Sequence, residues 1–292
     1  MAKDQKTPSN NARERARQVA SKQAKIKPGS GWVKATVALL VVAIVAIVAI
    51  VMINSQTKEI AESGPVPASA NQYGGIVIDK DGIVKDASDE PSRDFNTLYT
   101  ATASQTASEG ATASAMPLGI EDPKKAKTNG DPVKIVVFQD FNCVHCAEFE
   151  TEYGDEIQKL VDGGKATVEY RNLTFLDSAH PGEYSARAAN AAYSVANQVS
   201  ADNYLNWSRE MFTHQGNVLK NEEIIEIASK YGADIKEDMD NDTWRPLVKV
   251  VTPESSSNGV AGTPTVYADG QQYTTKDFNG WINGIISAKE KA

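Results

Sequence analysis

The longest apolar run in the chain lies near its N-terminus, and the apolar segments after it are short and periodic. Residues 35–53 carry no charged side chain and consist almost entirely of Ala, Val, Ile and Leu. As an α-helix this run covers about 28 Å, close to the hydrocarbon thickness of a bilayer. It is too long for the apolar region of a cleaved signal peptide. The pattern therefore predicts an uncleaved transmembrane signal anchor.

From about residue 131 the pattern is that of a folded domain. Residues 133–138 are nearly continuously apolar, as expected for a strand with both faces covered, and residues 166–173 alternate like a second strand. A turn at Asp269-Gly270-Gln271 predicts a hairpin. Helical patterns follow or separate these strands over residues 147–161, 183–201, 204–212, 221–231 and 276–288. Strands at both ends with helices between them indicate an α/β fold with a helical insert over about 178–250.

Residues 54–130, between the predicted span and this domain, are expected to form an extracytoplasmic tether with little core. Residues 62–67 have a linker-like composition, and residues 100–115 are almost entirely Ala, Ser and Thr. Such segments bury little apolar surface. Residues 75–85 could form one small hairpin around Lys80-Asp81-Gly82.

Charge differs in sign on the two sides of the predicted span. Residues 1–34 carry nine basic and two acidic side chains, a net charge of about +7, whereas the whole chain carries −8. Basic residues stay on the cytoplasmic side of a membrane. We therefore expect residues 1–34 to be a cytoplasmic tail and the domain to face outward. No aromatic residue precedes Trp32 in this tail, and no nucleic-acid-binding motif is present.

The two cysteines of the chain stand between the first strand and the first helix of the domain. Cys143 and Cys146 form a Cys-x-x-Cys motif. A thiol at a helix N-terminus has a lowered pKa, because unpaired N–H groups and the helix dipole favour negative charge. A second thiol one turn later can attack a mixed disulfide formed on the first. The motif predicts a redox-active dithiol, and any intrachain disulfide must join these two residues.

Metal binding is the competing use of these cysteines. A structural zinc site usually needs four ligands, and His180 and His214 could complete a set only if the fold brought them together. A Cu(I) carrier also places Cys-x-x-Cys between a strand and a helix. Such a carrier would not need a long helical insert. We expect no metal and no cofactor, and a peptide- or copper-binding module is the alternative from another class.

Three features together carry a family resemblance: residues 136–141 leading into Cys143-Val144-His145-Cys146, the alanine-rich helical insert, and Gly262-Thr263-Pro264-Thr265 before a strand. With them, the chain from about 131 to 292 resembles the DsbA-like branch of the thioredoxin superfamily. The resemblance implies a thioredoxin-like fold with a helical insertion. The basic tail, single span and tether resemble membrane-anchored members from Gram-positive actinobacteria.

The resemblance also implies a role for each site residue. Cys143 would be the exposed attacking thiolate and Cys146 the shielded resolving thiol. His145 would stabilise the Cys143 thiolate by charge or hydrogen bonding. Thr263 and Pro264 would form a cis peptide beside the dithiol, with neighbouring backbone that pairs with an extended substrate.

Two positions depart from the family pattern. Val144 stands where many DsbA-like proteins have proline, and Val137 stands where the best-known member has a buried glutamate. A carboxyl group that moves protons for Cys146 would have to be Asp140, Glu148 or Glu150. Each of these also fits an ordinary solvated or capping carboxylate.

The function implied by the resemblance is that of a membrane-anchored thiol–disulfide oxidoreductase that introduces disulfides into exported proteins. Its expected partners are exported cysteine-containing substrates and a quinone-linked membrane protein that reoxidises the dithiol, such as a vitamin K epoxide reductase-like protein. A disulfide reductase or isomerase is the alternative among enzymes, because the direction of transfer depends on redox poise.

Overall fold

The computed structural model describes residues 59–98, 116–178 and 182–292. The predicted tail, residues 1–34, and the predicted span, residues 35–53, lie outside these ranges. Within the described ranges, no helix is both long enough and apolar enough to cross a membrane. Residues 60–292 form the compact unit that contains the fold described below.

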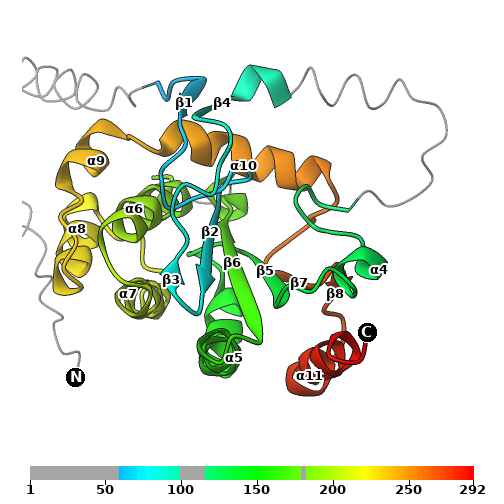
Figure 1. Cartoon of the computed structure of the whole chain (residues 1–292). Coiled ribbons are helices and arrows are strands. Elements are labelled where there is room, and N and C mark those ends of the chain that lie inside the picture. The colour runs from blue at the N-terminus through cyan, green and yellow to red at the C-terminus, as the bar shows by residue number, and fades with distance from the viewer. Residues whose placement is uncertain (1–58, 99–115, 179–181) are drawn as a thin grey trace, which may run out of the picture. The chain divides into compact units, whose positions relative to one another are not determined.

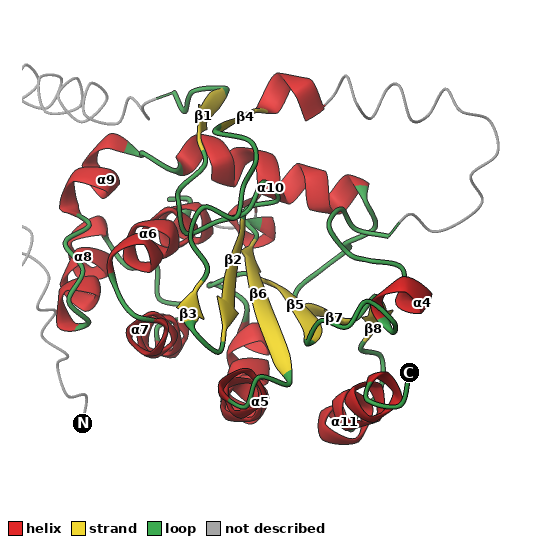
Figure 2. Ribbon diagram, in the orientation of Figure 1, coloured by secondary structure: helices red, strands yellow, loops and turns green. Residues whose placement is uncertain are grey.

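Among the described residues, a six-stranded sheet of order β3-β2-β6-β5-β7-β8 forms the centre of residues 60–292 (Figure 1, Figure 2). Its two middle strands, β5 and β6, are parallel, and the other pairs are antiparallel. β5 is buried at all but one position, as its continuous apolar sequence predicts. In chain order the strands are β2 Gly75–Asp79, β3 Gly82–Ile83, β5 Val133–Gln139, β6 Ala166–Asn172, β7 Thr265–Ala268 and β8 Gln271–Gln272.

Helices cover both faces of this sheet (Figure 1). α5 (Val144–Asp162) connects β5 to β6 and lies with α11 (Phe278–Lys289) on one side, whereas α10 (Arg245–Ser257) lies on the other. The short helix α4 (Pro123–Ala126) precedes β5. After β6, the 3-10 helix η1 (Phe175–Ser178) leads into the helical insert. In chain order, the helices between η1 and α10 are α6 Tyr184–Gln198, α7 Ala201–Thr213, α8 Asn221–Lys230 and α9 Lys236–Asn241.

The expected thioredoxin-like α/β fold with a helical insertion is confirmed. The main difference within the insert is α10, for which the sequence pattern predicts no separate helix. This helix contains Pro246 near its start, Pro253 in its interior, and several valines. Proline disfavours helix interiors and valine favours strands, so the local sequence does not predict a helix here. Its buried side chains stabilise it through packing instead.

Residues 60–98 belong to the folded domain, so the predicted tether over 54–130 is wrong for this segment. β2 and β3 form the small hairpin expected at 75–85. β2 also pairs with β6, with Gly75 opposite Arg171 and Ile78 opposite Val168. β1 (Ser63–Pro65) and β4 (Ser92–Asp94) form a second sheet that contacts α10. This segment is folded because its strand β2 pairs with the central strand β6, an interaction that the local sequence pattern does not record.

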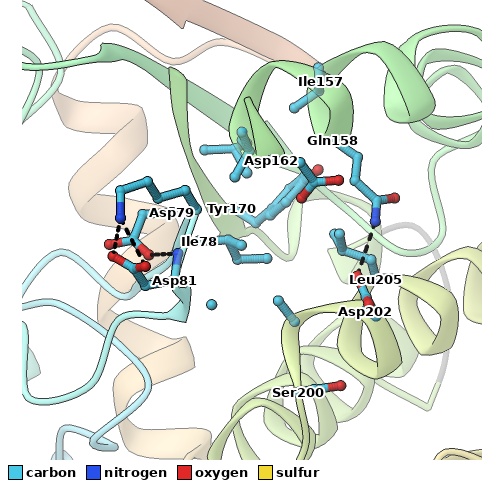
Figure 3. Close-up of a pocket in the computed structure, with 15 residues that line it drawn as sticks. Ile78, Asp79, Asp81, Ile157, Gln158, Asp162, Tyr170, Ser200, Asp202 and Leu205 are labelled. Atoms are coloured by element: carbon cyan, nitrogen blue, oxygen red, sulfur yellow. Dashed lines mark hydrogen bonds and ion pairs between the residues drawn. The ribbon is translucent and has the colours of Figure 1, made fainter. Parts of the chain in front are cut away.

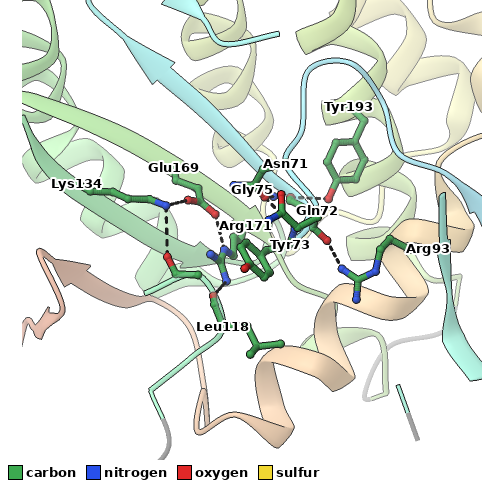
Figure 4. A network of polar contacts seen from close by, with 12 residues as sticks. Asn71, Gln72, Tyr73, Gly75, Arg93, Leu118, Lys134, Glu169, Arg171 and Tyr193 are labelled. Carbon is green, nitrogen blue, oxygen red and sulfur yellow. Dashed lines mark hydrogen bonds and ion pairs between the residues drawn. The ribbon is translucent and has the colours of Figure 1, made fainter. Parts of the chain in front are cut away.

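A buried ion-pair network, which we call the Glu169 network, lies on β5 and β6 next to residues 71–75 of this segment (Figure 4). The Glu169 carboxylate is fully buried and pairs with Arg171 (Nε–Oε1 2.6 Å) and Lys134 (Nζ–Oε2 2.7 Å). Arg171 donates to the Leu118 carbonyl (2.6 Å) and lies over the Tyr73 ring. Burial opposes ionisation of Glu169, but the two cations outweigh it and hold its pKa at about 2.

Candidate active site

Cys143 and Cys146 lie where β5 ends and α5 begins. Cys143 is the N-cap of α5, and its N–H donates to the Asp140 carbonyl (2.9 Å). α5 begins at Val144 rather than at the predicted residue 147, so Cys146 falls in its first turn. Both thiols are free, and the residues are only 6% and 2% exposed, respectively. Cys143 is therefore less exposed than the family resemblance implies.

The two thiols have opposite pKa shifts. Hydrogen bonds lower the pKa of Cys143 to about 5 against the effect of burial. The strongest comes from the Cys146 thiol, and the Thr263 side chain and the backbone N–H groups of Cys146 and His145 contribute the rest. Burial, followed by the neighbouring Cys143 sulfur, raises the pKa of Cys146 far above its ordinary value. Cys143 is thus the thiolate of the pair, and Cys146 keeps its proton.

Thr263 and Pro264 lie beside the dithiol, although they follow it by about 120 residues. The Thr263–Pro264 peptide bond is cis. The Cys143 Sγ atom lies 3.3 Å from the Thr263 carbonyl oxygen. The Thr265 hydroxyl donates to the Gly262 carbonyl (2.7 Å) and ties the turn to the start of β7. The fold therefore brings together the dithiol and the Thr-Pro segment that the sequence indicated.

His145 lies next to the dithiol, but its side chain is exposed. Its Nδ1 atom lies 2.9 Å from Oε2 of Glu148, and this hydrogen bond and charge raise the pKa of His145. The hydrogen bond from His145 that lowers the pKa of Cys143 comes from the backbone N–H. His145 thus contacts Cys143 through its main chain, and the charge of Cys143 contributes to the raised pKa of the imidazole.

Asp140 is built into the active-site turn. Its carboxylate is fully buried and accepts hydrogen bonds from the Asn142 N–H (2.9 Å), the Leu176 N–H (3.1 Å) and the Ser185 hydroxyl (2.6 Å). Burial raises the pKa of Asp140, and these hydrogen bonds oppose that rise. No cation is among the groups that offset its burial.

The other two carboxyl groups considered for proton movement have different surroundings. Glu148 is exposed and pairs with His145. Glu150 is buried on α5, where burial raises its pKa, but Arg209 of α7 pairs with it at 3.0 Å. Asp140 is therefore the one of the three that is both buried and free of an ion pair in the described structure.

The helical insert contacts all three residues that precede Cys143. Asp140 binds η1 and the start of α6, as described above. The Phe141 ring packs against Trp207 and Phe212 of α7, with ring centres 5.6 and 5.0 Å apart. The Asn142 side chain accepts the N–H of Gly216 (3.1 Å), just after α7. Sequence reasoning missed this support, because no local pattern links these residues to partners so far along the chain.

The histidines considered as metal ligands do not form a cluster with the cysteines in the described structure. His180 lies outside the described residues, and His214 is the C-cap of α7. Within the ranges that the structure covers, no group of three His, Cys, Asp or Glu side chains could hold a metal ion.

A dithiol at a helix N-terminus, a thiolate hydrogen-bonded by its partner thiol and a Thr-Pro turn against it define a thioredoxin-type site for thiol–disulfide exchange. The chain belongs to the thioredoxin family: the family model described as Thioredoxin matches residues 129–285.

Individual relatives are more distant. The serine/threonine-protein kinase PknE of Mycobacterium tuberculosis is 26% identical over 53% of this chain. The chain spans only 30% of the length of that kinase.

Two solved structures from Mycobacterium tuberculosis are similar to this chain. Oxidised DsbA is 27% identical, covering 55% of this chain and 89% of that one, with a TM-score of 0.46. The reduced disulfide bond oxidoreductase DsbG is 25% identical, covering 65% and 98%, with a TM-score of 0.47. Both scores are below 0.5, so family membership rests on the family model and on the site. On that basis, the thioredoxin-superfamily part of the recognition is confirmed.

Proposed function

We propose that this protein is an extracytoplasmic, membrane-anchored oxidase that introduces disulfides into exported proteins through Cys143 and Cys146. The observation that carries the proposal is the pKa of Cys143, which hydrogen bonds lower to about 5. Stabilising the thiolate stabilises the reduced dithiol, and a dithiol that is stable when reduced makes a strongly oxidising disulfide.

The proposed reaction conserves electrons and protons. A substrate thiolate attacks Cys143 in the Cys143–Cys146 disulfide and releases Cys146. The second substrate thiol then attacks the mixed disulfide and releases Cys143 as the stable thiolate. The substrate loses two electrons and two protons, and the dithiol gains two electrons. Cys146 takes up one of the protons, because burial raises its pKa, and the other passes to solvent, because Cys143 stays a thiolate.

Three further assignments belong to this proposal. Backbone next to Thr263 and Pro264 pairs with the extended substrate, since the Thr263 carbonyl already lies 3.3 Å from Cys143 Sγ. His145 contributes through its N–H. A quinone-linked membrane partner, such as a vitamin K epoxide reductase-like protein, reoxidises the dithiol. The apolar run at 35–53 and the basic tail before it support placement of the domain outside the cytoplasm.

The test is the reduction potential of the dithiol, measured by equilibration with glutathione. The protein used should begin at residue 60 rather than at 131, because β2 is part of the central sheet. A potential near about −120 mV supports the oxidase. A potential near about −270 mV assigns the site to a reductase instead.

A further inference from the structure

Asp140 contacts both cysteines through its main chain. Its carbonyl accepts the Cys143 N–H (2.9 Å) in the turn between β5 and α5. Burial raises the pKa of Cys146, and the backbone N–H of Asp140 is among the groups that oppose this rise. A shift of this one residue would therefore change the contacts of both members of the dithiol.

The side chain of Asp140 joins this turn to the helical insert. One carboxylate oxygen accepts the Asn142 N–H (2.9 Å) and the Ser185 hydroxyl (2.6 Å), and the other accepts the Leu176 N–H (3.1 Å). All three partners donate, which suits an ionised carboxylate that can only accept. An O–H···O⁻ bond of 2.6 Å is charge-assisted and roughly twice as strong as a neutral one. The bond to Ser185 is therefore the strongest of the three.

Ser185 is itself held in place at the start of α6. It is fully buried, and its N–H donates to one carboxylate oxygen of Asp177 (2.9 Å). The N–H of Ala186 donates to the other oxygen of the same carboxylate (2.9 Å). The first turn of α6 is thus fixed to η1, and the Ser185 hydroxyl is presented to Asp140 at a defined position.

We propose that Asp140 is a positioning residue for the dithiol and that Ser185 of the insert holds it in position. The proposal rests on the proposed function only in taking Cys143 and Cys146 as the redox pair. The N–H groups that stabilise the Cys143 thiolate belong to the first turn of α5. They stay directed at the sulfur only while the turn before α5 keeps its shape. The insert therefore tunes Cys143 through its hydrogen bond to Asp140.

Charge and positioning predict opposite effects of removing the Asp140 carboxylate. A carboxylate near a thiol disfavours the thiolate, so loss of its charge alone would lower the pKa of Cys143. Loss of positioning would raise that pKa, because the N–H groups of α5 would no longer be held at the sulfur. The sign of the change in pKa therefore separates the two roles.

The test compares two serines of α6 in the reduced full-length protein. Ser185→Ala removes the hydroxyl that bonds Asp140 and should raise the acid pKa of Cys143 by about half a unit, a threefold change in its dissociation constant. Ser194→Ala removes an equally buried hydroxyl that accepts from Trp244 (3.0 Å) and should leave that pKa unchanged. The pH dependence of alkylation by iodoacetamide reports the pKa, and equilibration with glutathione should show a less oxidising dithiol in Ser185→Ala alone.

Two further variants locate the effect. Asp140→Ala removes all three hydrogen bonds and should raise the pKa of Cys143 more than Ser185→Ala does, and the double variant should match Asp140→Ala, because both act through one bond. At the other end of α5, about 20 Å from the dithiol, Gln158 donates to Asp202 of α7 (3.1 Å) at the edge of an open groove (Figure 3). Gln158→Ala loosens the insert there and should leave Cys143 unaffected. If Asp140→Ala does not fold, Ser185→Ala and its control decide.

Three results would overturn the proposal. The first is an equal pKa of Cys143 in Ser185→Ala and Ser194→Ala. The second is a lower pKa of Cys143 in Asp140→Ala, which would show that only the charge acts. The third is slower disulfide exchange by Asp140→Ala with an unchanged pKa of Cys143, which would assign the carboxylate to proton movement. The proposed function fails on a different result, a reductase-like potential of the unmodified protein, which leaves these comparisons between variants valid.

Discussion

Cys143 and Glu169 are both buried groups with lowered pKa values, yet different interactions stabilise their charges. Two cations, Arg171 and Lys134, lower the pKa of Glu169 to about 2. Every group that lowers the pKa of Cys143 to about 5 is a hydrogen-bond donor, and the Cys146 thiol is the strongest. No cation is among the main causes of this shift.

The difference follows from what each charge must do. The Glu169 charge is permanent at neutral pH, and its ion pairs join β6 to β5 and fix Arg171 where it contacts Leu118 and the Tyr73 ring. The Cys143 charge disappears whenever a disulfide forms. Its main hydrogen-bond donor, Cys146, is the group that becomes the disulfide partner. The charge and its stabilising donor therefore vanish together, and no uncompensated cation is left behind in the site.

Replacing the thiolate should have the largest effect. Cys143→Ser should reduce disulfide transfer to the rate without protein, because a serine hydroxyl is not ionised at neutral pH and cannot form a disulfide. The measurement is oxidation of a reduced test protein by the full-length chain. Glu169→Gln is the matched variant, because it removes the other buried charge. It should transfer disulfides at the normal rate as long as it is folded. Transfer by Cys143→Ser at the normal rate would remove Cys143 from the mechanism.

Neutralising Glu169 should have the largest effect on stability. Glu169→Gln leaves Arg171 and Lys134 without their buried counter-charge, and we expect a loss of about 3–5 kcal/mol in the free energy of unfolding. Urea unfolding of the oxidised protein measures this loss. Glu148→Gln, at an exposed carboxylate, is the control and should lose less than about 1 kcal/mol. A loss from Glu169→Gln no larger than the control would show that the network adds no stability.

The charges of Cys143 and Glu169 should stabilise the fold over different pH ranges. The folded pKa of Cys143, about 5, lies below the value of about 8.5 for an unfolded cysteine, so its contribution is complete above that higher value and is lost as pH falls toward 5. The Glu169 contribution should persist to lower pH and be lost as pH falls from about 4.3 to about 2.

Unfolding of the reduced protein and of its Cys143→Ser variant, compared between pH 9 and pH 5, measures the first contribution. We expect the advantage of the reduced protein to shrink by a few kcal/mol, on the order of the shift in pKa. An advantage that grows as pH falls would mean that the Cys143 thiolate is destabilised by folding.

Removing the Cys146 thiol should raise the pKa of Cys143 toward its ordinary value, because this thiol is its strongest hydrogen-bond donor. Cys146→Ala should raise it more than Cys146→Ser, since serine keeps an O–H donor. The pH dependence of alkylation of Cys143 by iodoacetamide reports the pKa. Equal values in the two variants would show that the hydrogen bond from Cys146 is not the cause.

His145 should give the smallest effect. His145→Ala keeps the backbone N–H, so the pKa of Cys143 should change little and the reduction potential should fall only slightly. His145→Pro removes that N–H in the first turn of α5, where proline is tolerated, and should raise the pKa of Cys143 further. If alanine shifts the pKa as much as proline does, the imidazole itself stabilises the thiolate.

Local sequence was sufficient to predict much of the domain. The continuous apolar segment at 133–138 became β5, and the periodic segments of the insert became α6, α7 and α8 with shifts of a few residues. Cys143 and Cys146 were found from their spacing and from the strand and helix around them. These features depend on neighbours within a few residues, which a sequence pattern records directly.

Residues 60–98 and α10 show where local pattern is insufficient. Both have compositions that argue against their observed structure, since the first resembles a linker and the second contains prolines and valines. β2 is stabilised by pairing with β6, and α10 by its buried face. Tertiary contacts override propensity at both places.

The sequence alone therefore determined the presence of the dithiol, its place between a strand and a helix, and the α/β character of the domain. Only the tertiary structure decided which thiol is ionised, which carboxyl supports the turn and where the charges of the Glu169 network are paired. The reason is that a pKa depends on burial and on groups within a few ångströms. For Cys143, Asp140 and Glu169, several of those groups lie tens of residues or more away along the chain.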